Sequence, residues 1–173
     1  MNDLRLSFLQ EKILEQDALL RRLAVWRLAG KKIVFTNGCF DILHRGHITY
    51  LAKAAELGDK LVIGINSDAS VQQLEKAPNR PINTLSDRQL LVAALGFVDA
   101  VVAFEGPTPL ELISLVEPEV LVKGADYDAD ETDATSKKYI VGSDLVRSYG
   151  GEVKTISLVE GYSTTNLINK AAK

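Results

Sequence analysis

The sequence predicts an α/β domain in which parallel strands alternate with helices. Short, mostly apolar runs are separated by longer stretches in which apolar residues recur at helical spacing. Such alternation produces right-handed βαβ units, and therefore a parallel sheet with helices on both faces. We expect a Rossmann-like, doubly wound, five-stranded parallel sheet with the strand order 3-2-1-4-5 and an N-terminal helical extension. The expected strands are residues 33–35, 60–65, 99–103, 119–124 and 153–157.

The composition is that of an ordinary globular domain, with 173 residues of which 46% are hydrophobic and 25% charged. The net charge of −3 gives no electrostatic reason to expect binding to nucleic acid. No apolar run approaches the roughly 20 residues that span a membrane. The N-terminus shows no signal-peptide pattern, and the single cysteine, Cys39, excludes an internal disulfide. We therefore expect a cytoplasmic protein with no nucleic-acid or membrane partner.

The first thirty residues form a region of their own in the sequence. Between residues 3 and 29, apolar residues recur mostly at spacings of three or four, and charged residues fill the positions between them. This pattern predicts one or two amphipathic helices that end at Gly30. We divide the chain into this extension, residues 1–30, and one main domain, residues 31–173. The helices either dock on the domain or pair with another subunit, and we expect a homodimer.

The stretch around the only two histidines is the strongest chemical signal. The first strand is followed by a turn at Gly38, and apolar residues recur at helical spacing from Gly46 onward, so His44 and His47 lie at a helix entrance. A helix N-terminus attracts phosphate, and two imidazoles add donors that can be charged near neutral pH. Ordinary capping and a zinc pair are the alternatives. Zinc is disfavoured because the chain has no third histidine and one cysteine.

Four further helices are expected between the strands. Ser86 with Gln89, and Thr108 with Glu111, have the spacing of capping boxes that open two of them. Arg88 then lies in the first turn of a helix, where the macrodipole disfavours a cation. We therefore expect a role for Arg88 other than stabilising this helix. The expected ranges are residues 69–74, 86–95, 108–116 and 137–149.

Polar residues at the carboxyl ends of strands mark the rest of a ligand site. Asn66 and Asp68 follow the second strand, and Lys123 ends the fourth. Residues 163–166, Ser-Thr-Thr-Asn, cluster hydroxyl groups and an amide at a helix start and predict a second anion site. The alternatives are an ordinary N-cap and solvated surface charges. Neither a G-x-G-x-x-G motif after the first strand nor a P-loop is present, which argues against those two classes of nucleotide-binding protein.

Residues 40–47, F-D-x-x-H-x-G-H, resemble the signature of the cytidylyltransferase-like nucleotidyltransferases. With G-I-N-S-D at 64–68, L-V-K-G-x-D-Y at 121–127 and E-G-Y-S-T-T-N at 160–166, residues 31–172 are similar to the bacterial D-glycero-β-D-manno-heptose 1-phosphate adenylyltransferases. The resemblance implies transfer of AMP from ATP to the heptose 1-phosphate, giving pyrophosphate and an ADP-heptose for lipopolysaccharide core synthesis. It also implies Mg²⁺ carried by ATP and a separate heptose kinase upstream.

The resemblance also suggests roles for individual residues. His44 and His47 would hold the triphosphate and stabilise the transition state, and Arg88 would contact the β- and γ-phosphates. The sugar phosphate and ribose would contact Asp41, Lys123 and Asp126. No metal ligands are located. The residues expected to bind the nucleotide are Thr36, Asn37, Gly38, Phe40, Gly46, Asn66, Asp68, Gly124, Ser163, Thr164 and Thr165.

One departure from the related enzymes concerns the last motif. Relatives that use CTP often carry Arg-Thr before the glycine of this motif, whereas this chain has Leu158 and Val159. The difference weakens a cytidylyltransferase interpretation and leaves the role of that arginine unassigned. Two alternatives stay open: a cytidylyltransferase for another small phosphorylated acceptor such as glycerol 3-phosphate, and a nucleotide-binding module without turnover.

Overall fold

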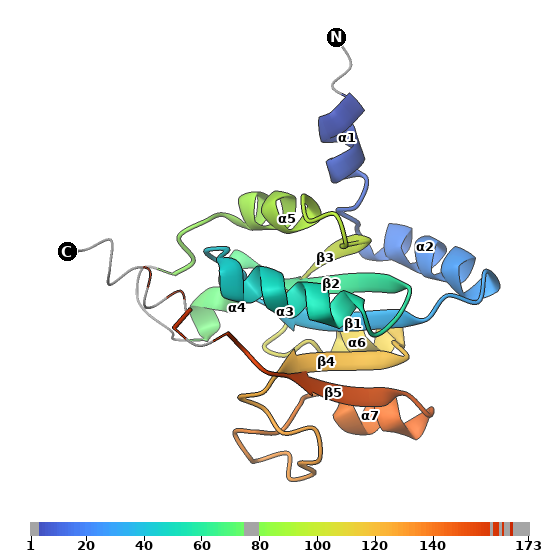
Figure 1. Ribbon diagram of the computed structural model, residues 1–173, viewed down its shortest axis with the longest axis vertical. Coiled ribbons are helices and arrows are strands. Elements are labelled where there is room, and N and C mark those ends of the chain that lie inside the picture. Colours follow the sequence, from blue (N-terminus) through green and yellow to red (C-terminus); the bar gives the residue numbers. More distant parts are fainter. Residues whose placement is uncertain (1–3, 75–79, 160, 163, 165–166, 168–173) are drawn as a thin grey trace.

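The computed structural model describes residues 4–74, 80–159, 161–162, 164 and 167, and these form a three-layer α/β domain around one parallel sheet (Figure 1). The strand order β3-β2-β1-β4-β5 confirms the predicted topology, and every strand pair is parallel. The strands are β1 (Ile33–Gly38), β2 (Lys60–Asn66), β3 (Ala100–Phe104), β4 (Val120–Gly124) and β5 (Glu152–Ile156).

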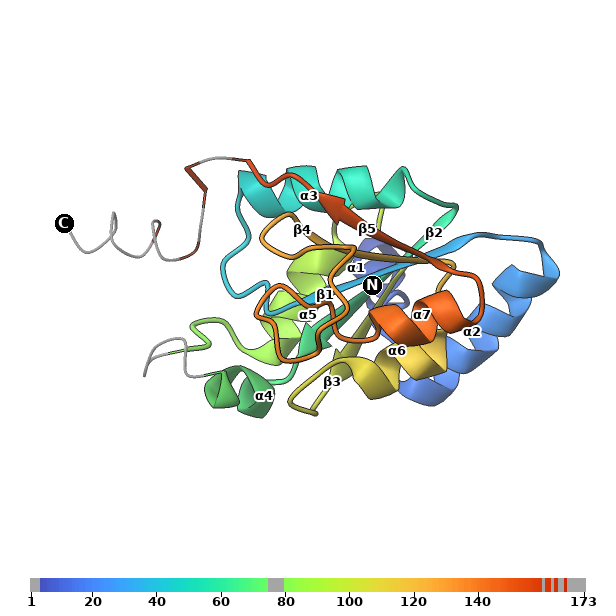
Figure 2. The same cartoon turned by 90° about the horizontal axis from the view of Figure 1, so that it is seen from below.

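Helices cover both faces of the sheet, as a doubly wound fold requires. The helices α2 (Gln16–Leu28), α6 (Leu110–Val116) and α7 (Ser143–Ser148) pack on one face, and α3 (Arg45–Ala55) and α5 (Leu85–Ala93) pack on the other. Figure 2 shows α3 on the opposite side of the sheet from α2, α6 and α7. Two short helices, α1 (Leu4–Gln10) and α4 (Asp68–Gln73), complete the described structure. Within it, no helix has the length and apolar character needed to cross a bilayer.

The central strand β1 shows why these residues form a buried strand. Ile33 and Phe35 belong to the core cluster under α2 and α6, whereas Val34 belongs to the cluster under α3 and α5, and all three are fully buried. Successive side chains point to opposite faces of a sheet, so a continuous apolar run satisfies both cores. The strand is longer than predicted, because Asn37 and Gly38 still pair with β2.

The N-terminal segment is attached to the domain at the β3 edge of the sheet. Ile13 forms a parallel bridge with Val101, and the Lys12 ammonium donates to the carbonyl of Ala93 at 3.1 Å. The α2 helix then buries three apolar side chains in the core, whereas α1 buries none and stands away from the sheet in Figure 1. Docking of α2 is therefore confirmed, and the homodimer stays a prediction.

Three predicted helix starts are wrong. The α5 helix is capped by Thr84, whose hydroxyl accepts from the Asp87 N–H, and not by Ser86. The α6 helix follows Pro109 without a side-chain cap, so the capping box at Thr108 does not form. The helix predicted over 137–149 is confined to α7, because Gly142 adopts a left-handed φ of 86° that ends any helix before it.

Replacing Leu23 by alanine tests the contribution of α2 to the core. Leu23 is fully buried, so we expect Leu23→Ala to lower the free energy of unfolding by about 2–5 kcal/mol. Leu28 lies on the same helix but is 90% exposed, and Leu28→Ala should change this energy by less than about 0.5 kcal/mol. Urea denaturation of both variants measures the difference. Equal effects would mean that α2 does not pack as described.

Candidate functional site

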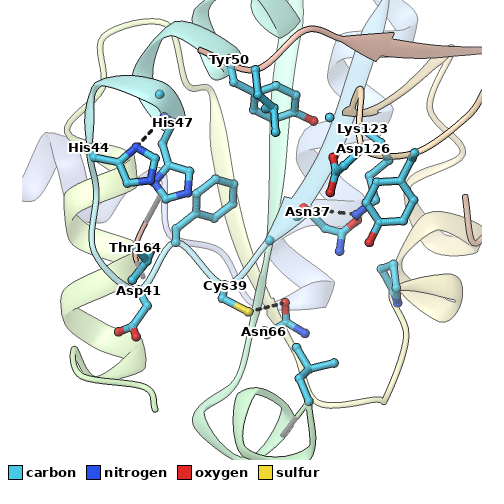
Figure 3. Close-up of a pocket in the computed structure, with 18 of the residues that line it drawn as sticks. Asn37, Cys39, Asp41, His44, His47, Tyr50, Asn66, Lys123, Asp126 and Thr164 are labelled. Atoms are coloured by element: carbon cyan, nitrogen blue, oxygen red, sulfur yellow. Dashed lines mark hydrogen bonds between the residues drawn. The ribbon is translucent and has the colours of Figure 1, made fainter. Parts of the chain in front are cut away.

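A cavity of about 580 Å³ opens at the carboxyl ends of the central strands (Figure 3). Strand order reverses direction between β1 and β4, and ligands of open α/β sheets bind at this switch point. The cavity wall is built by the turn after β1, the start of α3, the ends of β2 and β4, and the segment after β5. Most residues predicted for the site line it: Asn37, Gly38, Phe40, Asp41, His44, Gly46, His47, Asn66, Lys123, Gly124, Asp126 and Thr164.

Some predicted residues lie elsewhere. Thr36, Asp68 and Arg88 do not line the cavity. Ser163 and Thr165 lie outside the residues that the structure describes, so their predicted contacts with phosphate stay predictions.

The turn after β1 is held in an unusual conformation. Phe40 has a φ of 47°, in the left-handed region that residues other than glycine rarely adopt. Its side chain is buried. A Cβ on Gly38 would lie 3.1 Å from the Phe40 ring, so glycine leaves the ring room to fold back over the turn. The ring also packs edge-on against His47, with 5.4 Å between the ring centroids. This packing fixes the backbone that leads into α3.

The two histidines form one unit at the start of α3, the helix entrance at which the sequence places them. His44 is the N-cap, and its Nδ1 accepts from the backbone N–H of His47 at 3.3 Å. The two imidazole rings are stacked, with centroids 3.8 Å apart. Gly46 allows this arrangement, because a Cβ there would lie 3.0 Å from the His44 ring and 3.1 Å from the Cβ of Tyr162. Both rings line the cavity beside the positive end of the helix dipole.

The histidines are not charged near neutral pH in the free protein, which corrects the expectation from the sequence. Burial, and to a smaller extent the neighbouring His44, lower the pKa of His47 to about 4. Burial also lowers the pKa of His44. An anion in the cavity would favour the charged forms and raise both pKa values.

On another side of the cavity, Lys123 is held in place by its neighbours. Its ammonium lies 2.9 Å from Oδ1 of Asn37 and 5.1 Å from the centroid of the Tyr127 ring. The Asp126 side chain packs against Gly124, where an added Cβ would lie 2.5 Å from its Oδ1. Figure 3 shows Lys123, Asn37 and Asp126 grouped together, away from the histidine pair. The cavity thus has two polar ends.

Arg88 is placed in the interior rather than at the cavity. Its side chain is fully buried, and its three nitrogens donate to the carbonyls of Asn83 and Cys39 and to Oδ1 of Asp68, at 3.1, 2.7 and 2.7 Å. Asp68 also accepts from the N–H of Leu85 at 3.3 Å. These partners explain why a cation stands in the first turn of α5. The predicted contact of Arg88 with the β- and γ-phosphates would require it to leave them.

Thr36 also supports the site from behind. Its hydroxyl is buried and lies 2.7 Å from the hydroxyl of Tyr50, which itself lines the cavity. Tyr50 was not predicted, although it stands three residues after His47 and therefore on the same face of α3. Other lining residues that the sequence did not reveal are Cys39, Leu74, Arg80, Pro107, Thr108, Pro109, Tyr127, Val141, Leu158, Val159 and Tyr162.

Replacing Arg88 tests its role in the interior. We expect Arg88→Met to lower the free energy of unfolding by about 2–4 kcal/mol, because two carbonyls lose their donor and Asp68 loses its charged partner. Arg21→Met, at an exposed position of α2, is the control and should change it little. Urea denaturation measures both. A stable Arg88→Met protein would contradict a structural role.

The buried His47 should make stability depend on pH. The pKa of His47 is about 4 in the folded chain, below its ordinary value of 6.5. Between these values the unfolded chain binds a proton that the folded chain does not, so the free energy of unfolding falls as the pH is lowered. The contribution is at most about 1.4 kcal/mol per pH unit. Urea denaturation at about pH 7 and about pH 5 should show a smaller loss for His47→Gln than for wild type. Identical losses of stability in the two proteins would show that His47 does not cause the pH dependence.

The cytidylyltransferase-like family model matches residues 35–170. A bifunctional protein HldE of Campylobacter fetus is 55% identical over 164 residues, which cover 95% of this chain and 32% of that protein. The HldE of Magnetococcus marinus is 46% identical, over 98% of this chain and 34% of its own length. The chain therefore spans about a third of the length of these curated relatives.

Solved structures show the same fold. A lipopolysaccharide core biosynthesis protein from Thermoplasma volcanium superposes with a TM-score of 0.58 at 28% identity, covering 78% of this chain and all of that chain. A pantoate-β-alanine ligase from Francisella tularensis has the same TM-score at 14% identity, covers 92% of this chain and 76% of its own, and shares the fold alone. The family match spans most of the chain and includes the histidine pair and the turn before it, so this chain belongs to the cytidylyltransferase-like family.

Proposed function

We propose that this chain is a nucleotidyltransferase that transfers AMP from ATP to D-glycero-β-D-manno-heptose 1-phosphate and releases pyrophosphate. The observation that carries the proposal is the stacked pair of His44 and His47 at the N-terminus of α3, facing a cavity of about 580 Å³. The similarity to HldE proteins and to a lipopolysaccharide core biosynthesis protein favours the heptose substrate. A separate kinase would then supply the heptose 1-phosphate.

The reaction needs positioning and charge stabilisation more than proton transfer. A phosphate oxygen of the sugar phosphate attacks the α-phosphorus of ATP, and the bond between the α-phosphorus and the bridging oxygen to the β-phosphorus breaks. The electron pair leaves with pyrophosphate. A sugar phosphate has a second pKa near 6, so it is already an anionic nucleophile at neutral pH and requires no general base. The chain must therefore hold two anions in line and stabilise the charge between them.

The two ends of the cavity suit these two anions. The helix N-terminus and the histidines offer donors for the triphosphate, and an imidazole that takes up a proton as the anion binds would strengthen this contact. Lys123, oriented by Asn37, offers a cation for the acceptor phosphate. Among the described residues, no cluster of three metal-ligating side chains occurs. As part of the proposal, Mg²⁺ would enter on the phosphate oxygens of ATP, a mode that Mg²⁺ commonly uses, and would neutralise part of their charge.

The first experiment measures pyrophosphate release by the purified protein with Mg²⁺, crossing ATP and CTP with heptose 1-phosphate and glycerol 3-phosphate. We expect release with ATP and the heptose only. Release with CTP and glycerol 3-phosphate would replace the proposed substrates by those of a cytidylyltransferase. Nucleotide binding without release for any pair would identify a binding module without turnover.

The histidine pair should carry much of the rate. We expect His47→Ala to lower kcat by about 10²–10³-fold, as removal of one donor to a developing charge does in other enzymes. Arg21→Ala on the distant α2 serves as the control and should leave kcat unchanged. Steady-state kinetics with saturating substrates and a melting curve for each variant separate lost catalysis from lost folding. A folded His47→Ala enzyme with normal kcat would refute this role.

A further inference from the structure

Arg80 is a cation at the cavity that the sequence had not placed in the site. It lines the cavity, its side chain is only 10% exposed, and it follows the segment that lies outside the described residues. Its Nε lies 2.5 Å from Oδ2 of Asp41, whose side chain is fully buried. A long, flexible side chain is thus drawn down to the cavity wall by one ion pair.

Asp41 fixes the backbone that carries Arg80 as well as its side chain. Oδ1 of Asp41 accepts from the N–H groups of Ile82 and Asn83 at 2.8 and 2.9 Å. The side-chain amide of Asn83 donates in return to the backbone carbonyl of Asp41. Both carboxylate oxygens of Asp41 are therefore engaged by this one segment. Asp41 was predicted to contact the sugar phosphate, and its contacts assign it a different task.

Among the described residues, the two Nη atoms of the Arg80 guanidinium donate to no protein acceptor. Nε faces Asp41, and a guanidinium carries four further N–H groups on its two Nη atoms, in a planar fork that matches phosphate oxygens. Because the ion pair already orders the side chain, less conformational entropy is lost when a phosphate binds.

The position of Asp41 indicates which anion Arg80 meets. In Figure 3, Asp41 lies on the side of the cavity that holds Thr164 and the histidines, whereas Lys123 and Asp126 lie on the other side. In an in-line displacement the leaving group departs opposite the attacking oxygen. If Lys123 holds the acceptor phosphate, the departing pyrophosphate lies on the side of Asp41 and its partner Arg80.

We infer that Arg80 binds the β- and γ-phosphates of ATP and that Asp41 is the residue that positions it. The inference rests on the proposed nucleotidyltransfer, and it gives Arg80 the contact that the family resemblance suggested for Arg88. Arg88 is fully buried and donates from all three of its nitrogens to protein acceptors, whereas Arg80 lines the cavity.

The test compares ATP with AMP, because only ATP carries the phosphates in question. We expect Arg80→Gln to raise the Kd of Mg·ATP by about 10- to 100-fold, the usual effect of losing a charge-assisted hydrogen-bond pair. The Kd of AMP should stay within about twofold of wild type. Arg80→Lys, which keeps the charge without the planar fork, should recover part of the loss. Isothermal titration calorimetry of each variant measures all of these constants.

The control is Arg21→Gln, which removes one positive charge from an exposed position of α2. It should bind ATP and AMP as wild type does, which would show that the loss of one positive charge is not enough to weaken ATP binding. An unchanged ATP affinity in a folded Arg80→Gln protein would overturn the inference. Equal weakening of ATP and AMP, or an effect confined to the KM of the sugar phosphate, would overturn it too.

A double-mutant cycle tests the positioning role of Asp41. Asp41→Asn should weaken ATP binding in the wild-type background and add little in the Arg80→Gln background, because it acts through Arg80. A full additional loss in that background would show that Asp41 acts by another route. These binding measurements need no turnover. Wild-type protein that binds ATP but releases no pyrophosphate would refute the proposed function and leave the test of Arg80 intact.

Discussion

Two buried charged side chains, Asp41 and Arg88, hold the turn between β1 and α3 against the start of α5. Asp41 accepts from the backbone N–H groups of residues 82 and 83, and Arg88 donates to the carbonyls of residues 83 and 39. The segment before α5 is thus bound on both sides, and the left-handed conformation of Phe40 is enclosed within this network. The shape of the cavity depends on this arrangement, because the turn leads directly to the histidine pair.

Burying these charges is tolerated only because each one meets partners. Arg88 faces Asp68, and Asp41 faces Arg80, so neither charge stands alone in a low-dielectric interior. Such pairs add little net stability compared with a well-packed apolar core, yet removal of one partner is costly. Their value in this fold is geometric: they fix the relative positions of three segments that lie far apart in the sequence.

The cavity that results is divided electrostatically. One end holds a pair of imidazoles that burial keeps neutral in the free protein, beside a helix N-terminus. The other end holds an ammonium oriented by Asn37. A neutral histidine pair avoids a repulsion between two adjacent cations before the nucleotide arrives, and it can take up charge when the triphosphate is present. The charge of the histidine pair can therefore rise when the triphosphate binds, whereas a pair of permanent cations would repel each other in the free protein.

The sequence alone predicted the strand order, the place of the cavity and the position of both histidines at one helix start. The predictions rest on local patterns: apolar runs mark the strands, the right-handed crossover rule fixes the hand of their connections, and a spacing of three brings His44 and His47 to the same helix start. Only the tertiary structure decided how the buried charges pair. Asp68 and Arg88 are twenty residues apart, and Asp41 meets a partner thirty-nine positions later. Such pairing depends on how α4 and α5 pack beside the turn, and no spacing rule encodes that contact.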